Sequence, residues 1–176
     1  MEFAELTKVR RSVRKYEDKI ISDEQIREIV SAAQMAPSWK NTETGRYYVV
    51  RTPEKLEIFR QDVLPTFNQN SSKGAALIVT TFVKGESGFL KGEAANEVGD
   101  GWGAYDLGLQ NAYMILAASN MGLDTLIMGL RHSDKIREEL SVPENEEIVA
   151  VIAVGYRDGE PNFNPRKNLD DILKIY

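Results

Sequence analysis

The chain has 176 residues, no cysteine and a single histidine, which excludes disulfides, thiolate nucleophiles, iron–sulfur clusters and cysteine-ligated zinc. A histidine-ligated metal centre or a histidine-relayed catalytic triad would depend on His132 alone. The balance of 22 basic and 27 acidic residues gives a net charge of −5, which argues against a dedicated nucleic-acid binder. The composition predicts one globular domain spanning residues 1–176, whose reactive group, if it has one, is borrowed from a cofactor.

The first half of the chain predicts two helices and two strands. Ser22 and Gln25 have the spacing of a capping box, and apolar residues follow at helical intervals up to about 36. Pro53 is typical of the first turn of a second helix. In chain order, we expect a helix at 22–36, a loop at 38–45, a strand at 46–50, a helix from 52, a loop at 68–74 and a strand at 76–83.

The second half opens with the longest irregular stretch, the glycine-rich segment 84–103, which is a candidate lid. The following helix, 104–121, is apolar nearly all round, which is typical of a central, buried helix, and Gly122 ends it. We then expect a strand at 126–128, a helix capped by Ser133, a strand at 148–154, a loop at 156–168 and a short C-terminal helix. The alternation predicts a sheet covered on both faces and favours parallel β-α-β units, although it does not fix strand direction.

Three features allow more than one interpretation. Residues 99–104 match the G-x-G-x-x-[GA] dinucleotide pattern, but no predicted strand precedes them, so a Rossmann site is not expected. His132 lies where a surface or capping residue is common. Trp39 and Trp102 fall in predicted loops, where they either pack locally or border a planar ligand.

The sequence also bears on location. The first residues, 1–5, lack a basic segment followed by an apolar one, so no secretory signal is expected. The longest mostly apolar run, 75–83, is far shorter than the ~20 residues that span a bilayer. We therefore expect a cytoplasmic protein with no membrane or nucleic-acid partner.

The charge is unevenly distributed. Residues 8–19 carry six basic and two acidic side chains. Such a stretch is either a solvated basic surface or a site for a small anion such as a phosphate, since arginine offers a planar fork of donors.

Four motifs, in order along nearly the whole chain, resemble those of the FMN-dependent nitroreductase family. They are Arg10-Arg11-Ser12-Val13-Arg14, Ala36-Pro37-Ser38-Trp39-Lys40-Asn41, the helix segment Ala104 to Ala118, and Gly155 to Pro161 followed by Pro165-Arg166-Lys167. The resemblance implies an α+β, three-layer α/β/α fold with a central mixed, mainly antiparallel sheet. It also implies a homodimer with flavin at the interface.

The resemblance further implies an FMN-dependent NAD(P)H oxidoreductase that reduces nitroaromatics, quinones or related acceptors by a ping-pong hydride transfer through flavin N5. No catalytic side chain and no metal are required, because the cofactor carries the chemistry. Two alternatives stay open: a flavin-binding protein without turnover, for storage or sensing, and a dehalogenase-like member of the same fold.

The resemblance assigns roles by position. Arg10, Arg166 and Lys167 would hold the FMN phosphate, with Arg11 in the same motif, and Ser12 would bond along the ribityl chain. Arg14 would face the pyrimidine edge and stabilise its charge. The backbone at Met128 and Gly129 would approach N5.

The second motif would act across the dimer. Its Pro37, Ser38, Trp39 and Asn41 would reach the flavin of the other subunit. Glu43 departs from the family pattern, because many relatives carry a glutamine there and this chain carries a carboxylate. Whether Asn68, Gln69 or Asn70 touches the flavin is left open by the sequence.

Overall fold

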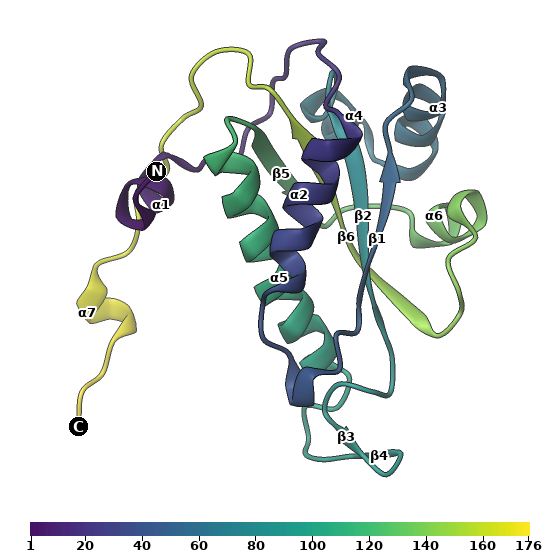
Figure 1. The fold of residues 1–176 in the computed structure, drawn as a ribbon, viewed down its shortest axis with the longest axis vertical. Coiled ribbons are helices and arrows are strands. Elements are labelled where there is room, and N and C mark those ends of the chain that lie inside the picture. The colour runs from purple at the N-terminus through teal and green to yellow at the C-terminus, as the bar shows by residue number, and fades with distance from the viewer.

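A four-stranded antiparallel sheet forms the centre of the computed structural model, which describes all 176 residues (Figure 1). Its strands are β1 (Gly45–Val50), β2 (Ala76–Val83), β5 (Asp124–Met128) and β6 (Glu146–Gly155), in the order β1-β2-β6-β5. Every pair is antiparallel, so the parallel units that alternation favours are wrong and the mainly antiparallel sheet is confirmed.

The connection between the first two strands explains why alternation misleads. Val50 at the end of β1 lies opposite Leu77 at the start of β2, so the connection leaves and re-enters the sheet at the same end. Two helices, α3 (Pro53–Val63) and α4 (Thr66–Ser71), make this excursion. A single crossover helix would instead carry the chain to the opposite end and give a parallel pair.

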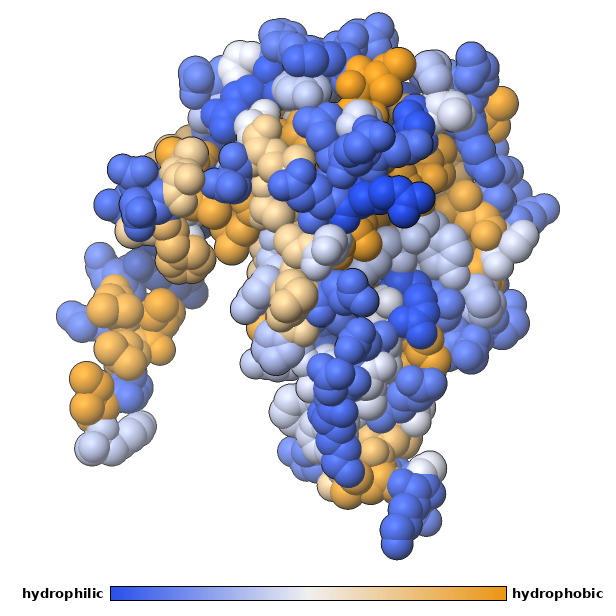
Figure 2. Space-filling view, in the orientation of Figure 1, coloured by the Kyte–Doolittle hydropathy of each residue, from blue (hydrophilic) through white to orange (hydrophobic).

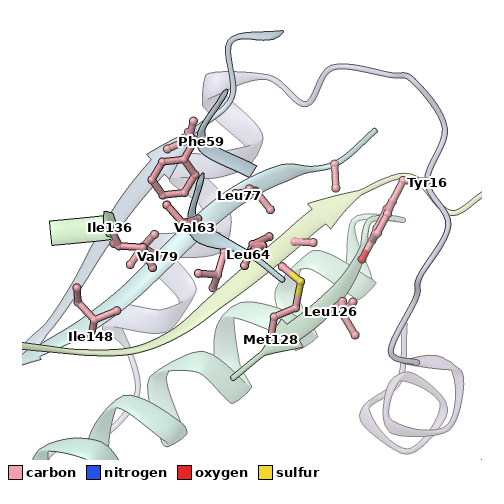
Figure 3. Close-up of a cluster of buried hydrophobic side chains, with 14 of the residues drawn as sticks. Tyr16, Phe59, Val63, Leu64, Leu77, Val79, Leu126, Met128, Ile136 and Ile148 are labelled. Carbon is pink, nitrogen blue, oxygen red and sulfur yellow. The ribbon is translucent and has the colours of Figure 1, made fainter. Parts of the chain in front are cut away.

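Helices cover both faces of the sheet, which confirms the three-layer arrangement. On one face, α2 (Asp23–Gln34) and α5 (Gly101–Asn120) lie side by side. The other face packs against α3 and α6 (Ser133–Leu140), with Phe59, Val63 and Ile136 buried against Leu77 and Val79 (Figure 3). Alternate residues of each central strand serve the two layers, as the pleat requires.

The local predictions hold at several helix ends and fail at others. The capping box of Ser22 and Gln25 is confirmed. His132, not Ser133, is the N-cap residue of α6, and its side chain accepts no capping hydrogen bond from the helix backbone. The polar stretch predicted as a loop at 68–74 lies partly in α4. Its polar side chains bond to nearby backbone, for example Gln69 Nε2 to the Leu64 carbonyl at 2.7 Å, so polarity there does not mean irregular chain.

The segment predicted as a loop at 84–103 is shorter and more ordered than expected. It holds a small hairpin, β3 (Phe89–Leu90) with β4 (Glu93–Ala94), and α5 begins at Gly101. No strand leads directly into the glycines at 99–104, as the sequence indicates.

The long helix α5 is buried on one face only, although its sequence predicts a central helix. Met114 and Leu107 are fully buried, whereas Tyr105 and Tyr113 are 59% and 45% exposed. The single chain thus leaves part of an apolar helix uncovered.

The C-terminal residues form an extended arm that carries α7 (Leu169–Ile172) away from the body (Figure 1). Large apolar side chains along it face solvent and give the arm its orange patches in Figure 2. They include Phe163, Ile172, Leu173 and Ile175. None of the helices in the structure has the length and hydrophobicity that a membrane-spanning segment requires.

Candidate functional site

The basic N-terminal motif runs as an extended segment beside the edge strand of the sheet. The helix α1 (Phe3–Val9) ends just before it, and Ser12 then forms a parallel bridge with Thr125 of β5. The Val13 amide donates to the Thr125 carbonyl at 3.0 Å, and the Val13 side chain is buried. In an extended chain alternate residues point to opposite sides, so Ser12 and Arg14 share the exposed side.

The C-terminal arm returns to this segment. The Arg11 guanidinium stacks over the Phe163 ring at 4.8 Å, and its Nη1 donates to the Arg10 carbonyl at 2.8 Å. Partial burial, the nearby charge of Arg166 and then that of Arg11 lower the pKa of Arg10. Arg10 and Arg166 are therefore close enough to repel each other, although they are more than 150 residues apart in sequence.

No carboxylate neutralises this basic group. The ion pairs of the chain lie elsewhere, and Arg10, Arg11, Arg14, Arg166 and Lys167 take part in none of them. Like charges that lie near each other without a counter-charge, as Arg10 and Arg166 do, favour the binding of an anion. We name these five residues, which share the absence of an ion-pair partner, the basic cluster.

The C-terminal end of β5, the edge strand of the sheet, contains another predicted part of the site, the backbone at Met128 and Gly129. Met128 is buried in the core, which leaves the Met128–Gly129 backbone at the strand end (Figure 3). A Cβ placed on Gly129 would meet no atom within 4 Å, so space adjoins this backbone. The Arg131 Nη1 donates to the Gly129 carbonyl at 2.7 Å.

Asn68 joins this region from α4. Its Nδ2 donates to the Leu130 carbonyl at 2.9 Å, and the residue is buried. Gln69 instead bonds to the backbone of its own helix region, and Asn70 is exposed. Of the three polar residues that the sequence leaves open, only Asn68 therefore lies against the strand end. A polar residue in a segment taken for a loop gives no sequence signal of this placement.

The second motif forms a tight loop at 36–44. Lys40, Asn41 and Glu43 all have positive φ, a conformation that is unfavourable for residues with a Cβ. Side chains hold it: the Glu43 amide donates to Ser38 Oγ at 3.1 Å, and Asn41 Nδ2 donates to Glu43 Oε1 at 2.8 Å. Glu43, the departure from the family pattern, thus fixes Asn41.

A buried carboxylate anchors this loop to α5. The Trp39 amide donates to Asp106 Oδ2 at 2.9 Å, and the Ser87 hydroxyl donates to the same oxygen. Asp106 is 3% exposed. It therefore connects the loop, the segment preceding α5 and α5 itself. Sequence reasoning missed Asp106 and Ser87, because nothing distinguishes an aspartate in the first turns of a helix from a solvated one.

Aromatic side chains surround the anchor. The Trp39 and Trp102 rings lie 5.0 Å apart, and Trp102 packs edge-on against Tyr105 at 5.5 Å. Trp102 Nε1 donates to Asn96 at 3.0 Å, whereas the buried Trp39 Nε1 has no partner. The local-packing interpretation therefore holds for both tryptophans, and the unpaired Trp39 N–H leaves the ligand interpretation open.

The two motifs lie at opposite ends of α5. The amino group of Met1 donates to Asn120 Oδ1 at 3.1 Å, which places α1 at the C-terminal end of the helix. Trp39 is bound to Asp106 near its N-terminal end. The 14 residues between these anchors span about 21 Å of helix. One chain therefore does not bring Pro37, Ser38, Trp39 and Asn41 to its own basic cluster (Figure 1).

The remaining candidate, His132, is exposed and is bound through its backbone: its amide donates to the Val63 carbonyl at 2.8 Å and its carbonyl accepts from the Ile136 amide at 3.1 Å. The geometry assigns it no chemistry. The residues that the structure gathers around the edge of β5 are instead suited to binding: cations, a buried amide and accessible backbone.

Solved structures of other proteins share this fold over nearly the whole length of the chain. A presumed nitroreductase from Exiguobacterium sibiricum 255-15, solved in complex with FMN, superposes with a TM-score of 0.85, at 21% identity, covering 100% of this chain and 98% of that one. A nitroreductase family protein from Streptococcus pneumoniae TIGR4 gives a TM-score of 0.84 at 22% identity, covering 99% and 100%. These identities show the shared fold alone.

Sequence comparison identifies the family. A presumed NADH dehydrogenase/NAD(P)H nitroreductase from Archaeoglobus fulgidus is 30% identical over 158 residues, which cover 88% of this chain and 84% of that protein. The family model described as "Nitroreductase family" matches residues 7–156. The chain is therefore a member of the nitroreductase family and an oxidoreductase.

Proposed function

We propose that this protein is an FMN-dependent NAD(P)H oxidoreductase that works as a homodimer and reduces nitroaromatics, quinones or related acceptors. One observation carries the proposal: partial burial and then the charge of Arg166 lower the pKa of Arg10, and neither arginine has a carboxylate partner. The similar fold of a protein solved with FMN, and the name of the relative from Archaeoglobus fulgidus, support the choice of cofactor and reductant.

The basic cluster fits the phosphate of FMN. Two guanidinium groups that repel each other gain most from a group carrying two negative charges, because each then finds an opposite charge at short range. Lys167 follows Arg166 in the exposed arm and adds a third cation. Ser12 presents its hydroxyl on the same side as Arg14, so it can donate to the polar chain that follows the phosphate.

The edge of β5 fits the ring. When bound, FMN accepts two electrons from NAD(P)H and passes them to the second substrate. Arg14 is exposed beside this edge, and its cation would oppose the negative charge that develops on the reduced ring. Gly129 leaves room for close approach of the backbone, and Asn68 offers a buried amide beside Leu130.

A second chain would complete the site. The loop at 36–44 is about 21 Å of helix away from the anchor of α1, so it can serve a flavin only in another subunit. The apolar side chains of the C-terminal arm (Figure 2) and the exposed tyrosines of α5 supply the surface that such a subunit would cover. Exposed apolar patches of this kind mark interaction surfaces.

The cofactor test uses the protein as purified. Denaturation is expected to release FMN, not FAD, and anaerobic mixing with NADH or NADPH is expected to bleach the flavin absorbance. Flavin that is bound but not reduced by either nucleotide would favour the storage or sensing alternative. Protein that retains and rebinds no FMN would contradict the proposal entirely.

The dimer has its own test. Light scattering of the purified protein is expected to give twice the chain mass. Tyr113→Glu places a charge on the uncovered face of α5 and is expected to dissociate the dimer, whereas Ile58→Glu, on the opposite layer, is the matched control because Ile58 is 60% exposed. A monomeric protein that still turns over would contradict the two-chain site.

A further inference from the structure

A cavity of about 450 Å³ lies away from the edge of β5, between the segment 15–21, α3 and the start of β2. Gly74 forms part of its wall in a conformation with φ +85°, and a Cβ there would stand 2.9 Å from the Tyr16 and Glu17 carbonyls. The cavity therefore depends on a glycine that lets two backbone segments meet. None of its lining residues belongs to the basic cluster.

A buried arginine reaches the cavity from α3. Arg60 is 6% exposed, its Nη2 donates to the Ala75 carbonyl at 3.3 Å, and its Nη1 pairs with Glu57 at 3.2 Å. Its Nε has no hydrogen-bond partner. Nε itself is enclosed, so an anion in the cavity would act on Arg60 through the charge of its guanidinium.

The charges around the cavity favour an anion. Five basic side chains line it, Lys15, Lys19, Arg51, Arg60 and Lys73, against three acidic ones, Asp18, Glu57 and Asp158. Lys15 is paired with Asp158 at 2.7 Å and Arg51 with Asp23 at 2.7 Å, whereas Lys73 has no ion-pair partner. The surplus of positive charge attracts an anion, and Lys73 offers it an unpaired cation.

Apolar side chains form another part of the wall. Ile20, Ile21 and Leu56 line the cavity, and Ile20 is exposed. A ligand here would therefore combine an apolar body with a charged end, as small-molecule sites commonly require.

We propose that this cavity is a second binding site, separate from the flavin site, for a small carboxylate with an apolar body. The carboxylate lies between Arg60 and Lys73, and the apolar body lies against Ile20, Ile21 and Leu56. The proposal does not depend on the proposed function, because it uses none of the residues of the basic cluster.

The test is calorimetric titration of the purified, flavin-containing protein with 2-naphthoate and with its neutral counterpart, 2-naphthamide. We expect one naphthoate per chain and at least about tenfold weaker binding of the amide, since a charged partner strengthens a hydrogen bond severalfold. Equal affinity for the two probes, or binding of neither, would overturn the proposal.

Substitutions locate the site. Lys73→Ala removes an exposed, unpaired cation and is expected to weaken naphthoate binding about three- to tenfold, and Arg60→Lys at least as much, because the planar fork is lost. Lys135→Ala removes an exposed lysine on α6 and serves as the matched control. Because Lys73 is exposed, its variant tests the site even where a change at Arg60 disturbs folding. Naphthoate that binds the Lys73 variant as tightly as the control would place binding elsewhere and contradict the proposal.

Discussion

At the C-terminal end of α5 the candidate site consists of cations on the surface, held by backbone contacts and lacking counter-charges. At the N-terminal end it consists of a strained loop that side chains help to fix: Ser38, Glu43 and the buried Asp106. The cations at the C-terminal end keep hydrogen-bonding groups free for a ligand, whereas the polar groups at the N-terminal end bond to the loop and hold its conformation. Substitutions at the first end should therefore lower the affinity for the ligand, and substitutions at the second end should lower the stability of the protein.

The largest effect is expected at the basic cluster. Arg166→Ala combined with Lys167→Ala should weaken FMN binding about a hundredfold or more, since each contact to a charged group contributes ~1.5–3 kcal/mol. The melting temperature of the flavin-free protein should stay unchanged, because both side chains are exposed and unpaired. Fluorescence titration with FMN measures the first quantity and calorimetric unfolding the second. Wild-type affinity in the double variant would remove the phosphate from this cluster.

The anchor of the loop should show the opposite behaviour. Asp106→Ala leaves the Trp39 amide and the Ser87 hydroxyl without their acceptor, and should lower the free energy of unfolding by about 2–4 kcal/mol. Hydrogen exchange should increase at residues 36–44. Asp134→Ala, at an exposed position on α6, is the control. Unchanged exchange in the loop would show that Asp106 does not hold it.

A smaller effect is expected at Arg14, whose substitution tests whether this residue lies at the pyrimidine edge of the flavin ring. Arg14→Ala should lower the reduction potential of bound FMN by roughly 20–80 mV, which corresponds to a charge interaction of about 1–4 kcal/mol in a two-electron couple. Lys15→Ala is the neighbouring control, since Lys15 is paired with Asp158. Dye-equilibration titration measures the potential, and the same value in both variants would place Arg14 away from the ring.

The smallest effect is expected at Glu43. Glu43→Gln keeps an acceptor for Asn41 Nδ2 and removes only the charge, so unfolding should change by less than about 0.5 kcal/mol. Glu43→Ala removes the acceptor and should raise the Michaelis constant for the acceptor substrate in steady-state assays. If the two variants behave alike, the bond to Asn41 does not position the loop.

Much of the fold could be predicted from local pattern. The sequence predicted the capping box of Ser22, the proline of α3 and the apolar strands, because each of these features depends on neighbours in sequence. Strand direction was not readable, because the excursion through α3 and α4 returns to the end it left and looks like a crossover in the sequence. The mainly antiparallel sheet followed only from family resemblance.

The residues of the candidate site also differ in whether the sequence could predict them. Runs of charge such as 10–14 and 165–167 stand out in any sequence, so their residues could be named, and in the folded chain the charge of Arg166 acts on Arg10. Asp106, Ser87 and Asn68 could not be named, because each acts by being buried against a segment distant in the chain. Burial of a single polar residue leaves no periodic signal.

The placement of the tryptophans has an optical consequence. The chain contains only two, and Trp39 and Trp102 pack against each other at one end of α5. All indole emission from this protein therefore originates in one small volume, next to the loop that would approach the second subunit's flavin. Energy transfer from these indoles to the yellow cofactor would read out the closeness of the two chains during assembly, without any added label.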